Sequence, residues 1–162
     1  MKKIEVYTDA SYSDATKDAI VGYVVYISGK QVAKNMYILA DVQNIQDAEC
    51  YAIYYAFSDL FGTHEGRFKV KLYMDQFNLL KVKEPLNRVA EKIMRNEVSE
   101  YIKASGNTVM WNLIKGHAPL HEMDKHQRRH SIIDRNLLAA MRDYLAVKKQ
   151  NEEISKKIAG VK

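Results

Sequence analysis

The chain has 162 residues, 47% of them hydrophobic, which predicts one domain with a sizeable core and excludes general disorder. A formal net charge of +5 and a pI of about 9.1 favour an anionic partner, with nucleic acid the first candidate. The single cysteine, Cys50, excludes an internal disulfide and fits a reducing, cytoplasmic setting. Neither a signal-peptide core nor an apolar run near the roughly 18 residues of a membrane span is present, so no membrane partner is expected.

The first expected strand, Lys3 to Asp9, alternates apolar and polar residues with a period of two and ends on a carboxylate. The stretch from Val70 to Asp75 repeats this plan, and both stretches end in Tyr-x-Asp. If the two strands are parallel neighbours, Asp9 and Asp75 meet at the carboxyl edge of one sheet, where open α/β sheets bind ligands. Two carboxylates held this close repel each other unless a proton or a cation lies between them.

Two more strands are expected before the first helix. Residues 12–18 predict a polar turn, and 19–28 is rich in β-branched and aromatic residues, which favour a buried strand. The Ser28-Gly29-Lys30 signal predicts a hairpin turn into a third strand over 31–39, nearer an edge of the sheet. These strands form an antiparallel meander.

The first expected helix begins at Asp47 as its N-cap and runs to about Phe61, with Gly62 just past its end. A strand over 68–74 follows, and this strand–helix–strand order implies a right-handed parallel crossover. The helix has a stripe at helical spacing that begins with an acid and is otherwise apolar: Glu49, Ala52, Ile53, Ala56, Phe57 and Leu60.

The second half of the sequence predicts helices over 76–83 and 86–105, a strand over 108–114 and a basic loop over 115–130. Ser131 is expected to cap a last helix, and the charged segment 151–162 predicts either a frayed tail or a helix. The expected buried side of the helix over 86–105 is Val89, Ile93, Val98 and Ile102. The expected stripe of the last helix includes Asp134, Leu137, Leu138, Met141 and Leu145.

Glu49 and Asp134 are acids in otherwise apolar helix stripes. Each alone fits a solvated acid near a helix start, and Asp9 and Asp75 alone fit turn residues at strand ends. All four, however, can point at one edge of one sheet, where they would be costly without a cation. Oxygen ligands suit Mg²⁺ or Mn²⁺, and two such ions about 3.5–4 Å apart can clamp a phosphodiester.

Five short motifs occur in order along residues 3–146: Tyr7-Thr8-Asp9-Ala10-Ser11, Asp47-Ala48-Glu49-Cys50-Tyr51-Ala52, Tyr73-Met74-Asp75, Ile114-Lys115-Gly116-His117-Ala118 and Asp134-Arg135-Asn136-Leu137-Leu138-Ala139. Together they resemble ribonuclease H of type 1 (ribonuclease HI), which cuts the RNA strand of RNA–DNA hybrids. The resemblance implies an RNase H-like α/β fold. Its five-stranded mixed sheet, a three-strand antiparallel meander followed by parallel strands, carries helices on both faces. A single domain over 1–150 and a charged tail over 151–162 are expected.

The same resemblance implies an endoribonuclease that uses two Mg²⁺ ions, with Mn²⁺ as a substitute, and acts as a monomer on an RNA–DNA hybrid. His117 would assist proton transfer or product release, and Ser11 and Gln46 would contact the minor groove of the hybrid. The implied metal ligands, which are also the implied catalytic acids, are Asp9, Glu49, Asp75 and Asp134.

Departures from the family pattern leave alternatives open. Ala10 replaces the usual glycine and Gln76-Phe77 the usual Ser-Gln, so a catalytically weak or inactive module that binds hybrids is one alternative. A nuclease for structured DNA and a protein-interaction domain are others. His126 and His130, four residues apart, could bind zinc on a helix, but without further ligands nearby we expect loop residues or phosphate contacts.

Overall fold

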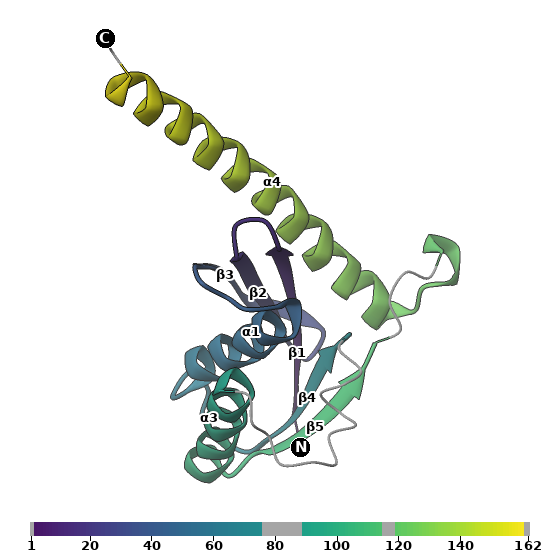
Figure 1. Ribbon diagram of the computed structural model, residues 1–162. Coiled ribbons are helices and arrows are strands. Elements are labelled where there is room, and N and C mark those ends of the chain that lie inside the picture. Colours follow the sequence, from purple (N-terminus) through teal and green to yellow (C-terminus); the bar gives the residue numbers. More distant parts are fainter. Residues whose placement is uncertain (1, 76–88, 115–118, 161–162) are drawn as a thin grey trace.

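The computed structural model describes residues 2–75, 89–114 and 119–160 (Figure 1). Within these ranges the chain forms one five-stranded sheet in the order β3-β2-β1-β4-β5. Pairing is antiparallel between β1, β2 and β3 and parallel between β1, β4 and β5, which confirms the predicted mixed sheet. The strands are β1 (Lys2–Ser13), β2 (Asp18–Ile27), β3 (Lys30–Leu39), β4 (Phe68–Met74) and β5 (Thr108–Leu113).

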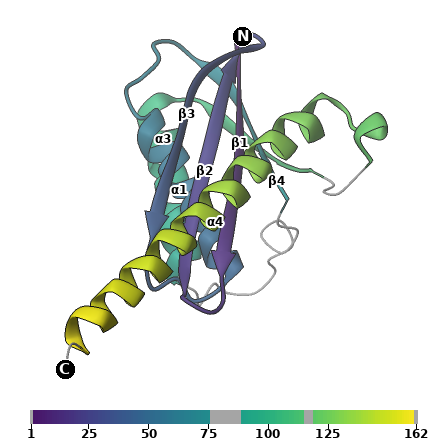
Figure 2. The same ribbon diagram turned by 90° about the horizontal axis from the view of Figure 1, so that it is seen from above.

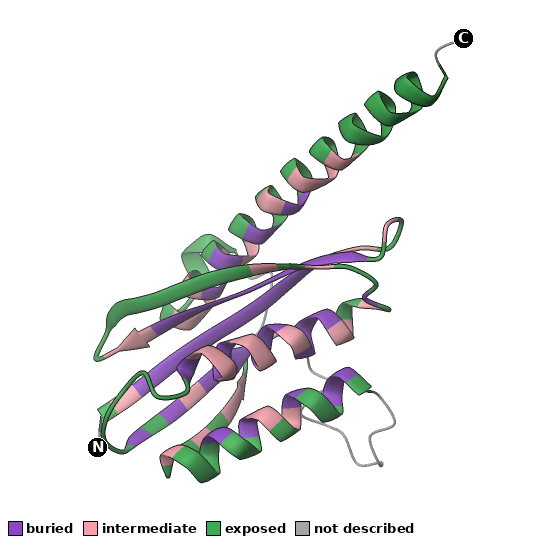
Figure 3. Ribbon diagram, turned by 90° about the vertical axis from the view of Figure 1, so that its left-hand side faces the viewer, coloured by how far each residue is buried: buried purple, intermediate pink, exposed green. Residues whose placement is uncertain are grey.

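Helices cover both faces of the sheet, as predicted. Helices α1 (Ile45–Leu60) and α3 (Val89–Ser105) pack together on one face, and α4 (Lys125–Ala159) crosses the other (Figure 3). A short 3₁₀ turn, η1 (Leu120–Glu122), precedes α4. The carboxy-terminal part of α4 extends past the sheet (Figure 2), and its segment 151–159 is helical and exposed (Figure 3). Over the described residues, no helix combines the length and the apolar character that crossing a membrane requires.

The alternation along β1 divides the core between the two faces. Ile4 and Val6 are fully buried against α1 and α3. Tyr7 points to the other face, where it packs beneath Leu137 and Met141 of α4. A fully buried side chain of this size contributes about 1.5–3 kcal/mol, so burial on both faces fixes the register of β1.

The start of α1 differs from the prediction. The N-cap is Asn44, whose side chain accepts a hydrogen bond from the Asp47 backbone N–H at 2.8 Å, so Asp47 lies inside the helix. The end is as expected, since Phe61 is the C-cap and Gly62 follows with a φ of +68°. All six residues of the predicted stripe are buried, including Glu49. The predicted turn over 12–18 is also shorter, because β1 continues to Ser13 and β2 begins at Asp18.

The predicted buried side of α3 is wrong except for Val98. Val89, Ile93 and Ile102 are exposed, and the buried residues are Ala90, Glu91, Met94, Val98 and Tyr101. The buried side instead carries Met94 and Tyr101, which join the core that α1 shares with the sheet, and the Tyr101 ring contacts Phe57 of α1. The helix predicted over 76–83, and residues 86–88 of the next, lie outside the described residues.

The predicted loop over 115–130 is wrong from Lys125 onward, where the chain is helical, and the predicted cap at Ser131 is wrong. Residues 115–118 of that loop lie outside the described residues. Helix α4 begins seven residues earlier, because Asp124 and Gln127 form a reciprocal capping box at 2.8 and 2.9 Å. His126 and His130 are therefore helical. Of the predicted stripe, Leu137 and Met141 are buried, Asp134 and Leu145 are half-buried, and Leu138 is exposed.

Candidate active site

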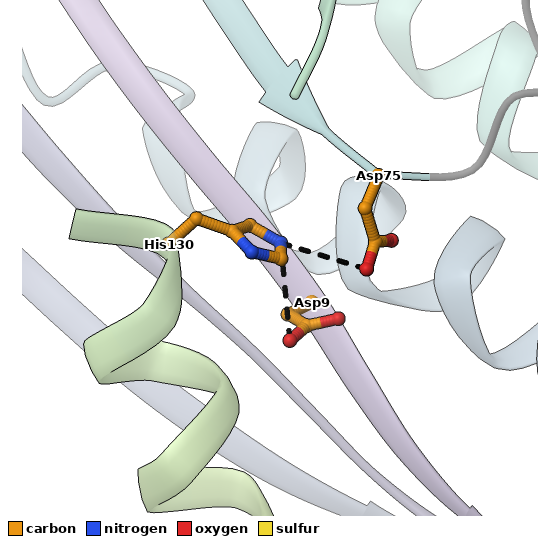
Figure 4. A group of neighbouring side chains, drawn as sticks. All are labelled: Asp9, Asp75 and His130. Carbon is orange, nitrogen blue, oxygen red and sulfur yellow. Dashed lines mark ion pairs between the residues drawn. The ribbon is translucent and has the colours of Figure 1, made fainter. Parts of the chain in front are cut away.

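Asp9 and Asp75 lie side by side at the carboxyl edge of the sheet. The parallel register pairs Tyr7 of β1 with Tyr73 of β4, so the aspartate two residues after each tyrosine reaches the same edge. Asp9 is 2% exposed and shares a face of β1 with Tyr7, the face that α4 covers. Figure 4 shows the two carboxylates converging on the imidazole of His130, which projects from α4.

Glu49 joins this pair from α1. Its carboxyl is buried, and burial together with the charges of Asp9 and Asp75 raises its pKa well above the usual range. Burial also raises the pKa of Asp9, to about 8, with the Asp75 charge acting in the same direction. Hydrogen bonds from Glu49 and from the Ala10 backbone N–H, the latter at 2.9 Å, oppose this rise. The metal-free cluster therefore favours proton retention.

Asp134 approaches the cluster from α4, one turn after His130. It is half-buried, and its charge is among the causes that raise the pKa of Asp9. The four predicted acids thus act on one electrostatic site, although they come from four separate elements or strand ends. Their convergence was predicted from the sequence, and their roles remain predictions.

Three buried carboxylate oxygens in the cluster have no hydrogen-bond partner among the described residues: Asp9 Oδ2, Glu49 Oε2 and Asp75 Oδ1. Leaving a buried acceptor unsatisfied costs about 1–3 kcal/mol, and more when it is charged. Carboxylate oxygens are the donors that hard divalent cations prefer. The residues present therefore fit a divalent metal centre.

The predicted substrate-contact residues Ser11 and Gln46 lie on β1 and α1, the two elements that also carry Asp9 and Glu49. Ser11 follows Asp9 by two residues on β1 and is 7% exposed. Gln46 lies in the first turn of α1, half-buried, where it lines a cavity of about 490 Å³ together with Asn44 and Ala90. His117 lies outside the described residues.

The family model for RNase H matches residues 1–129. The chain belongs to the RNase H family. Membership supports ribonuclease H activity in general. A search of curated proteins by sequence found no match.

Solved RNase H structures share the fold of the chain at low sequence identity. RNase H1 from the halophilic archaeon Halobacterium salinarum is 18% identical, with a TM-score of 0.54 over 74% of this chain and 87% of that one. LC11-RNase H1 in complex with an RNA/DNA hybrid is 21% identical, with a TM-score of 0.56 over 68% and 84%. The N-terminal RNase H domain of a Mycobacterium tuberculosis protein is 10% identical, with a TM-score of 0.57 over 70% and 87%.

Sequence reasoning missed His130 as a member of this RNase H site. Its Nε2 lies 3.8 Å from Asp9 Oδ2 and 4.0 Å from Asp75 Oδ2, and its side chain is 7% exposed. A signal was present, because Asp124-x-x-Gln127 has the form of a capping box and predicts a helix start there. In a helix that begins there, His130 and Asp134 lie on one face, one turn apart.

An aromatic and ionic network fixes the start of α4 over the RNase H sheet. Arg129 donates to the hydroxyl of Tyr7 at 2.9 Å and to Glu5 at 3.3 Å, and its guanidinium lies 3.9 Å from the centre of the Tyr26 ring. The Tyr7 ring stacks on Tyr73 at 4.8 Å. Since Arg129 adjoins His130, these contacts hold the imidazole over the acids.

Proposed function

We propose that the chain is a metal-dependent endoribonuclease that hydrolyses the RNA strand of RNA–DNA hybrids. The observation that carries the proposal is the cluster of Asp9, Glu49 and Asp75, whose buried oxygens lack hydrogen-bond partners, in a chain of the RNase H family. The likeness in fold to LC11-RNase H1, solved in complex with an RNA/DNA hybrid, supports the choice of substrate. We further propose that the enzyme acts as a cytoplasmic monomer.

In this proposal Asp9, Glu49, Asp75 and Asp134 hold two divalent ions, Mg²⁺ or Mn²⁺. When bound, such ions activate a water and stabilise charge on the leaving oxygen of a phosphodiester. Asp9 and Glu49 must lose their protons to act as ligands, and the raised pKa values mean that this loss opposes binding at low pH. The Ala10 N–H orients the Asp9 carboxylate through its bond to Oδ1.

In this proposal, side chains other than the four acids recognise the hybrid. Ser11 and Gln46 would contact the minor groove, and the 2′-hydroxyl of the RNA strand would distinguish it from DNA. His117 would assist proton transfer or product release. The net charge of +5 favours binding of the polyanion and predicts weaker binding at higher salt.

The test is cleavage of a labelled RNA–DNA hybrid, with RNA–RNA and DNA–DNA duplexes measured in parallel in Mg²⁺ and in Mn²⁺. The proposal predicts that only the hybrid is cut and that Asp75→Asn abolishes cutting, while Asp143→Asn, at an exposed position of α4, retains it. Hybrid binding without cleavage in either metal would instead establish a non-cleaving hybrid-binding module. Neither binding nor a response to metal would overturn both assignments.

A further inference from the structure

One nitrogen and two oxygen atoms that could bind a metal lie close together between β1, the end of β4 and α4. The Nε2 of His130 and one carboxylate oxygen each from Asp9 and Asp75 all lie within 4.8 Å of one another (Figure 4). Asp9 and His130 are buried, and Asp9 Oδ2 makes no hydrogen bond to any described residue. The site therefore offers a nitrogen donor beside its oxygens.

The spacing of these atoms differs from that of hydrogen-bonded ion pairs. Separations of 3.8 and 4.0 Å exceed the roughly 2.7–3.2 Å of an N–H···O bond. Two ligand bonds of about 2.1 Å to one ion allow their atoms to lie up to about 4.2 Å apart. The imidazole and each carboxylate thus stand at distances that one ion can bridge.

We propose that His130 supplies a nitrogen ligand to the metal centre formed by Asp9 and Asp75, and that this ligand makes the centre select first-row transition ions over Mg²⁺. The inference builds on the proposed metal-dependent function. Mg²⁺ prefers oxygen ligands and near-ideal octahedral geometry, whereas imidazole suits transition ions. A mixed nitrogen and oxygen set therefore raises the affinity for Mn²⁺ and later ions more than the affinity for Mg²⁺.

The fold prepares this histidine for the role. Asp124 caps α4 six residues before His130, and Arg129 anchors the helix to Glu5 and Tyr7. The helix then presents Asp134 one turn beyond on the same face, so a single rigid element delivers a nitrogen and an oxygen to the acids of the sheet.

The competing role for His130 is that of a counter-ion. A protonated imidazole between Asp9 and Asp75 would take the place of a cation and would compete with every divalent ion alike. The two roles predict opposite effects of removing the imidazole, since loss of a ligand weakens Mn²⁺ binding and loss of a competitor strengthens the binding of both ions.

The experiment measures Mn²⁺ and Mg²⁺ binding to the full chain by titration calorimetry, and the Mn²⁺ complex by pulsed EPR, which detects nitrogen bound to the ion. His130→Ala and His130→Asn are compared with His121→Ala, a control at an exposed histidine of η1. We expect both His130 variants to weaken Mn²⁺ binding roughly tenfold or more and Mg²⁺ binding about threefold or less. The ¹⁴N coupling should be present in the wild type and in His121→Ala and absent from the His130 variants.

A wild-type Mn²⁺ complex without ¹⁴N coupling overturns the proposal, whether or not the variants fold. Equal losses of Mn²⁺ and Mg²⁺ affinity, or tighter binding of both by His130→Ala, also overturn it. If the wild type cleaves the hybrid but shows no ¹⁴N coupling, the proposed nitrogen ligand is refuted while the proposed nuclease function is supported. Failure of the wild type to bind either ion would refute both the proposed nuclease function and the proposed nitrogen ligand.

Discussion

Asp9→Asn should stabilise the metal-free protein at alkaline pH, because it removes a buried negative charge that Asp75 repels. The pKa of Asp9 is about 8 in the folded chain against 3.8 for a free side chain. A carboxyl whose pKa rises on folding adds its full stability below about pH 4, and this contribution is lost as the pH rises toward 8. At about 1.4 kcal/mol for each pKa unit, the loss amounts to at most about 6 kcal/mol.

The assay is urea unfolding in a chelator at pH 5 and at pH 8.5, for the wild type and for Asp9→Asn. The wild type should lose up to about 4 kcal/mol of stability between the two pH values relative to the variant, because the remainder of the limit is already lost between pH 4 and pH 5. Asp143→Asn, at an exposed position of α4, serves as the control and should follow the wild type. A difference between wild type and Asp9→Asn that changes by less than about 1 kcal/mol across this range would refute the account of a strained acid cluster.

Three further predictions concern the metal and α4. At pH 8, Mn²⁺ at a hundred times its dissociation constant should stabilise the wild type by about 2.7 kcal/mol, which a thermal melt detects as a higher melting temperature. The melting temperature of Asp75→Asn should be nearly unchanged by the metal. Asp124→Ala should cost about 1 kcal/mol in urea unfolding, because α4 loses its capping box; no change would argue against the helix start at Lys125. Leu137→Ala should cost about 2–5 kcal/mol and Leu138→Ala under about 0.5, and equal costs would contradict the orientation of α4.

The sheet and its acids were predictable because short-range patterns determine them. The alternation of β1 and β4 and the repeated Tyr-x-Asp place Asp9 and Asp75 together once the strands are parallel neighbours. Glu49 alone fitted a solvated acid near a helix start, and it was predictable as a member of the cluster only because its helix stripe faces the sheet edge where Asp9 and Asp75 meet. In each case the burial of one face leaves a single workable register.

The errors arose where competing patterns were closely matched. In α3 the apolar residues surround much of the helix, so the choice between Ile93 and Met94 as the inward residue depends on packing against α1. The start of α4 was missed because its first turns are basic and lack apolar periodicity. Contacts of Arg129 with Glu5 and Tyr7, more than 120 residues away in the chain, hold that polar segment on the sheet.

The place of His130 in the site could not be predicted from the sequence, because it too depends on long-range contacts. Its spacing from Asp134 suggests a shared helix face, but only the crossing of α4 over β1 and β4 brings its imidazole to Asp9 and Asp75. That crossing depends on long-range packing of Leu137 and Met141 on the sheet.

The most direct test of the central claim is single-turnover cleavage of an end-labelled RNA–DNA hybrid, started by adding Mn²⁺ or Mg²⁺ to enzyme and substrate held in chelator. The account predicts no cleavage before the metal is added, then cutting of the RNA strand alone to 5′-phosphate and 3′-hydroxyl ends, and none with Asp75→Asn. Cleavage that proceeds in chelator, or that survives in Asp75→Asn, would contradict the assignment of the acid cluster as the metal-binding active site.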